Sequence, residues 1–234
     1  MKKSAVVFSF SIYSHIGKEL VFKGGTCLYK IHKLNRFSED LDFTLTKRFD
    51  VRKLIDFITT DFKLLNINCK IKEIKEYQKE INVRLLFNGP LYKRSKETQC
   101  FIPLNISLRE QVEEAEKSSI YSFYREIPNF EVFSISEREI LAEKVRAIFT
   151  RQKPRDIYDL FFLLMEKNME IDKNIIDKKL KLYNIDFEYR KFLDRIGMMK
   201  GLWESDLKNL VIGTLPLFNN IKKYLHEKFL VLKS

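Results

Sequence analysis

The chain has 234 residues, of which 45% are hydrophobic and 13% aromatic, so it can build a folded core and is not a disordered protein. Glycine and proline are scarce, with 7 and 5 residues, which argues against linkers and low-complexity segments. The formal net charge of +11 favours an acidic partner such as nucleic acid, although a lysine-rich composition by itself would give the same excess.

Cysteine and histidine are few and widely spaced. Cys27, Cys69 and Cys100 fit neither a disulfide framework nor a close-spaced zinc pattern, which indicates a reducing compartment. The three histidines are equally dispersed, so a zinc site or a histidine-based triad has little support. Residues 1–15 combine a basic start with an apolar stretch, but no cleavage site follows and charged residues come too soon for a membrane span. We therefore expect an N-terminal helix in a cytoplasmic protein with no membrane partner.

A glycine pair marks the first corner of the chain. Residues 20–22 form a short apolar run that ends at Gly24 and Gly25, and residues 26–32 then read as a turn of helix. The pattern therefore predicts a strand-to-helix corner at the glycines.

The next element carries two aspartates. Residues 40–45 alternate polar with apolar side chains, which predicts a strand with Asp40 and Asp42 on the same face. Asp50 is placed to cap the helix that follows. The elements expected next are that helix over residues 51–65 and strands over residues 67–74, 81–87 and 101–108.

The character of the chain changes near residue 133, because everything downstream reads as helix. Ser136 and Glu139 have capping-box spacing and open a helix that runs to about residue 152. Pro154 suits the first turn of the next helix. Further helices are expected near residues 173–183, 187–196 and 217–230. We therefore predict a mixed α/β domain over residues 1–134 and a helical bundle domain over residues 135–234.

The carboxylate pair and the glycine turn suggest a common chemistry. Side chains two residues apart on a strand point the same way, so Asp40 and Asp42 can hold a hard cation such as Mg²⁺, or Mn²⁺ in its place. The turn Gly24-Gly25-Thr26 would let backbone amides approach a triphosphate closely. Either feature alone is weak, since most such pairs are merely exposed and most glycine pairs are merely turns.

The order of these features resembles the signature of the polymerase-β-like nucleotidyltransferases, in which the turn ends in Ser or Gly, so that Thr26 is a mild departure. Four blocks narrow the match: residues 22–28 (FKGGTCL), 36–43 (RFSEDLDF), 139–147 (EILAEKVRA) and 155–160 (RDIYDL). Together they resemble the AbiEii/AbiGii toxin family of nucleotidyltransferases over roughly residues 20–165. The resemblance implies an α+β fold, with a mixed sheet flanked by helices and a helical bundle after it.

Lys144 is unusual by its spacing alone. Ile140, Lys144 and Ile148 form one row on the helix after Ser136, so the lysine interrupts an apolar stripe. A cation on a buried face must pair with an acid, extend to water or contact a ligand such as a triphosphate. The sequence leaves these alternatives open.

The family resemblance implies that Lys144 and Asp156 complete the catalytic set of Asp40 and Asp42, with Asp159 as a further candidate. Asp156 follows Pro154 in a first helical turn, where the helix dipole favours a carboxylate even without a function. A functional Asp156 is expected to face the aspartate pair and not solvent. The residues that the resemblance and the turn suggest for nucleotide binding are Lys23, Gly24, Gly25, Thr26, Arg36, Ser38 and Arg155.

Two of these residues have an ordinary alternative. Arg36 reads equally well as a surface charge. Ser38, with Glu39, reads equally well as part of the loop that shapes the start of the strand.

Asn105 is a departure from the expected pattern. Nucleotidyltransferases of this kind often have a third carboxylate on a later strand, and the corresponding position here is Asn105. An amide can ligate weakly through its carbonyl but cannot act as a base. Either another carboxylate such as Asp156 deprotonates the acceptor, or the site mainly orients the reactants, or activity is lost.

We therefore expect transfer of a nucleoside monophosphate from an NTP to a hydroxyl, with release of pyrophosphate. The resemblance implies a toxin with a cognate antitoxin, and the basic charge favours RNA, such as the 3′ end of tRNA, as acceptor. One alternative keeps the site but modifies a protein or a small molecule. The other is a catalytically weak module that binds RNA or a partner.

Overall fold

The computed structural model describes residues 2–88, 92–93, 95, 98–122 and 124–233. These residues form two compact units: the described residues up to 33 with those from 38 to 135, and residues 34–37 with those from 136 to 233. Within the described ranges, no helix is both long and apolar enough to cross a membrane.

The first unit is built on a mixed sheet. Its seven strands lie in the order β3-β4-β5-β2-β1-β7-β6, and the pairs β1–β7 and β2–β5 are parallel while the other neighbours are antiparallel. The strands are β1 (Leu20–Lys23), β2 (Leu41–Leu45), β3 (Cys69–Glu76), β4 (Glu80–Phe87), β5 (Cys100–Ser107), β6 (Ala115–Ile120) and β7 (Phe130–Ile135). A mixed sheet with flanking helices confirms the predicted α+β class.

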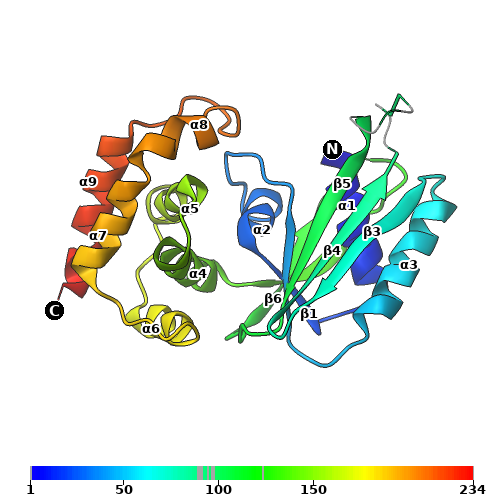
Figure 1. The fold of residues 1–234 in the computed structure, drawn as a ribbon, viewed down its shortest axis with the longest axis horizontal. Helices are drawn as coiled ribbons and strands as arrows, with labels where there is room; N and C mark the ends of the chain where they lie inside the picture. Colours follow the sequence, from blue (N-terminus) through cyan, green and yellow to red (C-terminus); the bar gives the residue numbers. More distant parts are fainter. Residues whose placement is uncertain (1, 89–91, 94, 96–97, 123, 234) are drawn as a thin grey trace. The chain divides into compact units, whose positions relative to one another are not determined.

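Helices cover the two faces of this sheet differently. Helices α1 (Lys2–His15) and α3 (Val51–Leu64) pack together on one face, whereas the short α2 (Gly24–Lys30) lies on the other beside β1 and β2 (Figure 1). The ring of Phe8 in α1 lies 4.4 Å from that of Phe62 in α3, and both approach Phe87 of β4. Burying such a side chain stabilises the fold by roughly 1.5–3 kcal/mol, so this aromatic cluster fixes the helices on the sheet.

The predicted N-terminal helix, the corner at the glycines and the cap of α3 are confirmed. The Asp50 side chain accepts hydrogen bonds from the backbone N–H groups of Arg52 and Lys53. Strands β6 and β7 were not predicted. Strand β6 is an edge strand with mostly exposed residues, and an exposed strand has no apolar alternation to detect.

The second unit is helical in its described residues. Helices α4 and α5 have the expected starts, because Ser136 accepts a hydrogen bond from the backbone of Glu139 and Pro154 occupies the first turn of α5. Helix α4 contacts α5, α6 and α7. The α-helices are α4 (Glu137–Thr150), α5 (Pro154–Met165), α6 (Lys173–Lys181), α7 (Tyr189–Met198), α8 (Trp203–Leu207) and α9 (Phe218–Phe229), with 3-10 turns η2 (Lys200–Leu202) and η3 (Leu230–Leu232). That these helices form a separate domain stays a prediction.

A segment of the first half of the sequence belongs to this helical unit. Residues 34–37 are held there by main-chain hydrogen bonds from Phe37 to Leu210 and from Ile212 to Asn35, 2.9 and 2.7 Å long. The predicted boundary at residue 134 does not anticipate this segment, because four residues carry no periodic signal. Its consequence is that Arg36 and Ser38 lie in different units.

Candidate active site

The strand-to-helix corner brings backbone directly against a carboxylate. Gly24 begins α2 with φ +75°, a left-handed conformation that L side chains rarely adopt. A Cβ at this position would lie 2.5 Å from Oδ2 of Asp42 and 3.0 Å from its Cβ. Only glycine therefore fits here, and the Gly24 main chain packs on the carboxylate of Asp42.

Asp42 lies between two polar neighbours on the same sheet face. Its register partners are Lys23 on β1 and Asn105 on β5. The Asn105 Nδ2 donates a hydrogen bond of 3.0 Å to Asp42 Oδ1. The structure therefore places Asn105 beside Asp42 on the neighbouring strand, and its amide holds one oxygen of the half-buried Asp42.

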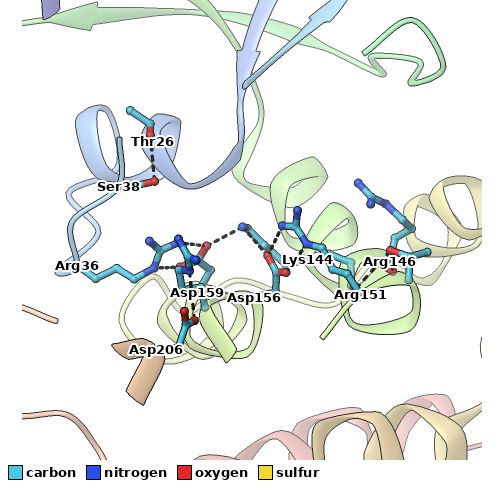
Figure 2. A network of polar contacts seen from close by, with 12 residues as sticks. Thr26, Arg36, Ser38, Lys144, Arg146, Arg151, Asp156, Asp159 and Asp206 are labelled. Atoms are coloured by element: carbon cyan, nitrogen blue, oxygen red, sulfur yellow. Dashed lines mark hydrogen bonds and ion pairs between the residues drawn. The ribbon is translucent and has the colours of Figure 1, made fainter. Parts of the chain in front are cut away.

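Thr26 fixes the loop that precedes the aspartates. Its buried hydroxyl lies 2.5 Å from the main-chain carbonyl of Asp40. The same hydroxyl lies 3.0 Å from the hydroxyl of Ser38, a contact that Figure 2 shows. Asp40 itself is exposed and directly precedes β2. Thr26 thus holds the main chain at Asp40, and the Ser38 hydroxyl contacts Thr26, which is consistent with the loop-shaping alternative that the sequence offered for Ser38.

The aspartate pair suits a hard cation completed by a ligand. Asp40 and Asp42 offer carboxylate oxygens at alternate positions, and Mg²⁺ commonly takes one or two protein carboxylates together with substrate phosphates. In the part of the chain that the structure describes, no three or more His, Cys, Asp or Glu side chains gather to form a metal site. The residues present therefore fit a magnesium ion that needs the nucleotide to complete its coordination.

A second cluster lies in the helical unit. Lys144 of α4 is 5% exposed, and its Nζ lies 3.0 Å from Asp156 Oδ1 and 2.6 Å from Asp159 Oδ2, both on α5. Of the alternatives left by the sequence, pairing with an acid is the one found. The two aspartates are spaced i, i+3 on α5, which puts them on one face of the helix.

Two arginines extend this cluster at either end. Arg36 donates from Nε and Nη2 to Asp159 Oδ1 and Oδ2 at 2.6 and 2.7 Å, and from Nη1 to the Phe37 carbonyl at 3.0 Å. Arg151 donates from Nε and Nη2 to Asp156 Oδ2 and Oδ1 at 2.7 and 2.8 Å (Figure 2). We call these five residues, Arg36, Lys144, Arg151, Asp156 and Asp159, the buried ion cluster; four of them are buried, and the Arg151 side chain is 47% exposed.

The alternative of Arg36 as a surface charge is wrong. Arg36 is 2% exposed, because the 34–37 segment is held by the helical unit and points its guanidinium at Asp159. Arg151 was missed by the sequence analysis. It lies between α4 and α5, where no periodicity shows which way a side chain points.

The charges of the cluster keep one another ionised. Burial raises the pKa of Asp156, but the charges and hydrogen bonds of Lys144 and Arg151 outweigh it and leave that pKa far below its ordinary value. Burial likewise raises the pKa of Asp159, and Arg36 and Lys144 lower it further than burial raises it. Burial lowers the pKa of Lys144, and the two aspartates more than restore it. Three cations thus face two carboxylates at neutral pH, which leaves one positive charge in excess.

Arg155 stands apart from this cluster. It is on α5, but its Nε pairs at 3.2 Å with Asp206 of α8 and its side chain is partly exposed.

The candidate residues therefore gather in two groups. The first unit holds Lys23, Gly24, Gly25, Thr26, Ser38, Asp40 and Asp42, and the helical unit holds Arg36, Lys144, Arg155, Asp156 and Asp159.

Comparison with solved structures supports the fold. The chain is similar to the crystal structure of JHP933 from Helicobacter pylori, with a TM-score of 0.62 and 21% identity over 99% of this chain and 90% of the other. It is also similar to MenT4, a nucleotidyltransferase toxin from Mycobacterium tuberculosis, with a TM-score of 0.64 and 15% identity over 99% of this chain and 82% of the other. No curated protein sequence matches the chain.

The family comparison covers nearly the whole sequence. The profile described as "Nucleotidyl transferase AbiEii toxin, Type IV TA system" matches residues 10–225. This range includes the glycine corner, both aspartates and the buried ion cluster. The chain therefore belongs to the AbiEii family of nucleotidyltransferase toxins from type IV toxin–antitoxin systems.

Proposed function

We propose that this nucleotidyltransferase moves a nucleoside monophosphate from an NTP to a hydroxyl of RNA, with the 3′ end of tRNA as acceptor, in a magnesium-dependent reaction. The observation that carries the proposal is the contact between the Gly24 main chain and the Asp42 carboxylate. It puts a backbone without a side chain beside the carboxylates, where a triphosphate and its cation need room.

The bonds exchanged are those at the α-phosphorus. The acceptor oxygen forms a bond to the α-phosphorus, the bond from that phosphorus to the bridging oxygen breaks, and pyrophosphate leaves. Asp40 and Asp42 would hold Mg²⁺, or Mn²⁺, which would neutralise charge on the phosphates. Lys23, register partner of Asp42, and the turn of Gly24 and Gly25 would contact the triphosphate.

The acceptor proton needs no strong base in this scheme. Asn105 cannot accept it, and both oxygens of Asp156 already accept hydrogen bonds from Lys144 and Arg151. A carboxylate with a strongly lowered pKa is also a weak general base. We infer that the site works by orienting the reactants and stabilising charge, with the proton released to water.

The buried ion cluster would act through fixed charge. Lys144 is 5% exposed and is paired with Asp156 and Asp159, so its role would be to fix the charge and geometry of the cluster and not to follow a mobile substrate. Asp156 and Asp159 hold Lys144 in place, and Arg36 holds Asp159. Arg155 lies outside the cluster and, like Arg151, is partly exposed, so both guanidinium groups are accessible to a phosphate.

Labelled nucleotides test the proposal. Each of the four α-labelled NTPs is incubated with the protein, Mg²⁺ and total cellular RNA and protein, and the label is followed into each fraction. We expect label in small RNA, and a loss of about a hundredfold or more in Asp42→Asn. The matched control is Asp56→Asn, an exposed carboxylate on α3.

The other results separate the alternatives. Label found in protein or in a small molecule would show that this molecule, and not RNA, is the acceptor. RNA binding without any transfer would support the catalytically weak module, for which Asn105 in place of a third carboxylate is the specific observation. Equal activity of Asp42→Asn and the control would contradict the proposed site.

A further inference from the structure

One face of the sheet stays open beside the aspartates. Val83, Leu85 and Phe87 of β4 are buried on the side of α1 and α3, so the alternate residues of β4 point to the opposite face. On that face α2 packs on β1 and β2 (Figure 1). Side chains of β3, β4 and β5 that point there are exposed or half-buried. We call this the open sheet face, formed by Lys70, Lys75, Asn82, Arg84, Leu86 and Phe101.

The open sheet face is continuous with the carboxylates. Asp42 has Asn105 as its register partner, and Asn105 has Asn82 on its other side. Lys75 of β3 follows Asn82 in the same row. A polymer whose end lies at Asp42 can therefore extend over this row without crossing a helix of the first unit.

An aromatic ring, that of Phe101, lies further along β5, the strand that carries Asn105. Phe101 is 58% exposed and has Leu86 as its register partner, whose side chain is half-buried. From Asn105 to Phe101 the strand rises about 13 Å, at about 3.3 Å per residue. A large exposed ring on a sheet is costly to leave in water and offers a flat surface on which a base can stack.

Cations surround this ring and the row before it. Arg84 is exposed between Asn82 and Leu86, and Lys70 is the register partner of Leu86 on β3. Lys75 Nζ pairs with Glu73 Oε1 at 2.7 Å, and Glu73 is the register partner of Arg84, so these two cations lie close together. With Lys70 they outnumber the carboxylates of Glu73 and Glu80, so the surface complements phosphate.

We propose that the open sheet face binds the single-stranded segment of an RNA acceptor, with a base stacked on Phe101 and the backbone along Arg84 and Lys75. A sheet with exposed aromatic and basic side chains is a common platform for single-stranded nucleic acid. A protein partner fits less well, because apolar side chains on this face are few and the charge is basic. The inference rests on the proposed function in that RNA is the acceptor.

Binding without catalysis tests the surface. The probe is a fluorescein-labelled single-stranded RNA of about 12 nucleotides, and its anisotropy is measured without NTP or Mg²⁺ at several salt concentrations. Phe101→Ala should weaken binding about five- to a hundredfold. Arg84→Glu should weaken it and reduce the salt slope by about one or more. The matched controls on α3, at the opposite face, are Leu64→Ala and Lys53→Glu, and both should bind as the wild type does.

Three results decide the outcome. Wild-type affinity in both Phe101→Ala and Arg84→Glu would overturn the inference. Transfer to RNA by the same protein preparations in the labelled-NTP assay would show that the proposed function still stands. If these variants lose binding and the wild type transfers no nucleotide, the RNA-binding surface is supported and the proposed function is contradicted. A wild type that does not bind the probe would overturn the inference. Unchanged thermal unfolding of the variants confirms that both are folded.

Discussion

The buried ion cluster makes a strong prediction about stability. Asp159 is fully buried and accepts hydrogen bonds from Arg36 and an ion pair from Lys144 within 2.7 Å. Asp159→Asn keeps the shape of the side chain but leaves the Arg36 guanidinium buried without its counter-ion. Removing one partner of a buried ion pair costs about 3–5 kcal/mol. At about 2–4 °C per kcal/mol for a chain of this size, the melting temperature should fall by roughly 6–20 °C.

The assay is urea and thermal unfolding followed by circular dichroism, with a surface pair as control. Glu131→Gln removes the partner of Lys117 in a pair whose side chains are both 60% exposed, and should cost under about 1 kcal/mol. Arg36→Met and the double variant Arg36→Met/Asp159→Asn complete a mutant cycle. Because the double variant leaves no unpaired charge on Arg36, it should lose less than the sum of the two single variants. Additive losses, within about 0.5 kcal/mol, would refute this reasoning.

Three further predictions concern the site and pH. Gly24→Ala would place its Cβ 2.5 Å from Asp42 Oδ2 at a φ of +75°, so we expect lower stability and loss of transfer in the labelled-NTP assay. Wild-type activity of this variant would contradict a role for the close contact between Gly24 and Asp42. Asn105→Asp adds a carboxylate beside Asp42, so Mn²⁺ affinity measured by calorimetry should rise several-fold. Without metal, repulsion between the two carboxylates should lower the stability by about 0.2–1 kcal/mol. Unchanged Mn²⁺ affinity would argue against a metal at this position. Asp156 and Asp159 have lowered pKa values in the folded state, so their stabilisation is present above an unfolded pKa of about 3.9 and is lost as the pH falls below it. Urea titrations at decreasing pH should show this loss in the wild type and a smaller one in Asp159→Asn.

Local patterns in the sequence were sufficient for most elements of the fold. The apolar run before Gly24, the alternation around Asp42, the cap at Asp50 and the proline at 154 each predict an element that the structure contains. These signals are reliable because they depend on backbone geometry within a few residues. Strand β6 lacked such a signal because its side chains face water on an edge.

The residues of the site likewise divide into those that the sequence identified and those that only the structure brought together. The sequence by itself determined the family, the glycine corner with its aspartate pair, and the need for Lys144 to have a partner on an apolar helix face. Only the tertiary structure decided which groups meet. The Asn105 amide reaches Asp42 because β5 pairs with β2 across 63 positions of sequence, and Arg36 reaches Asp159 across 123. Contacts between residues so distant along the chain depend on strand register and helix packing, which no local pattern encodes.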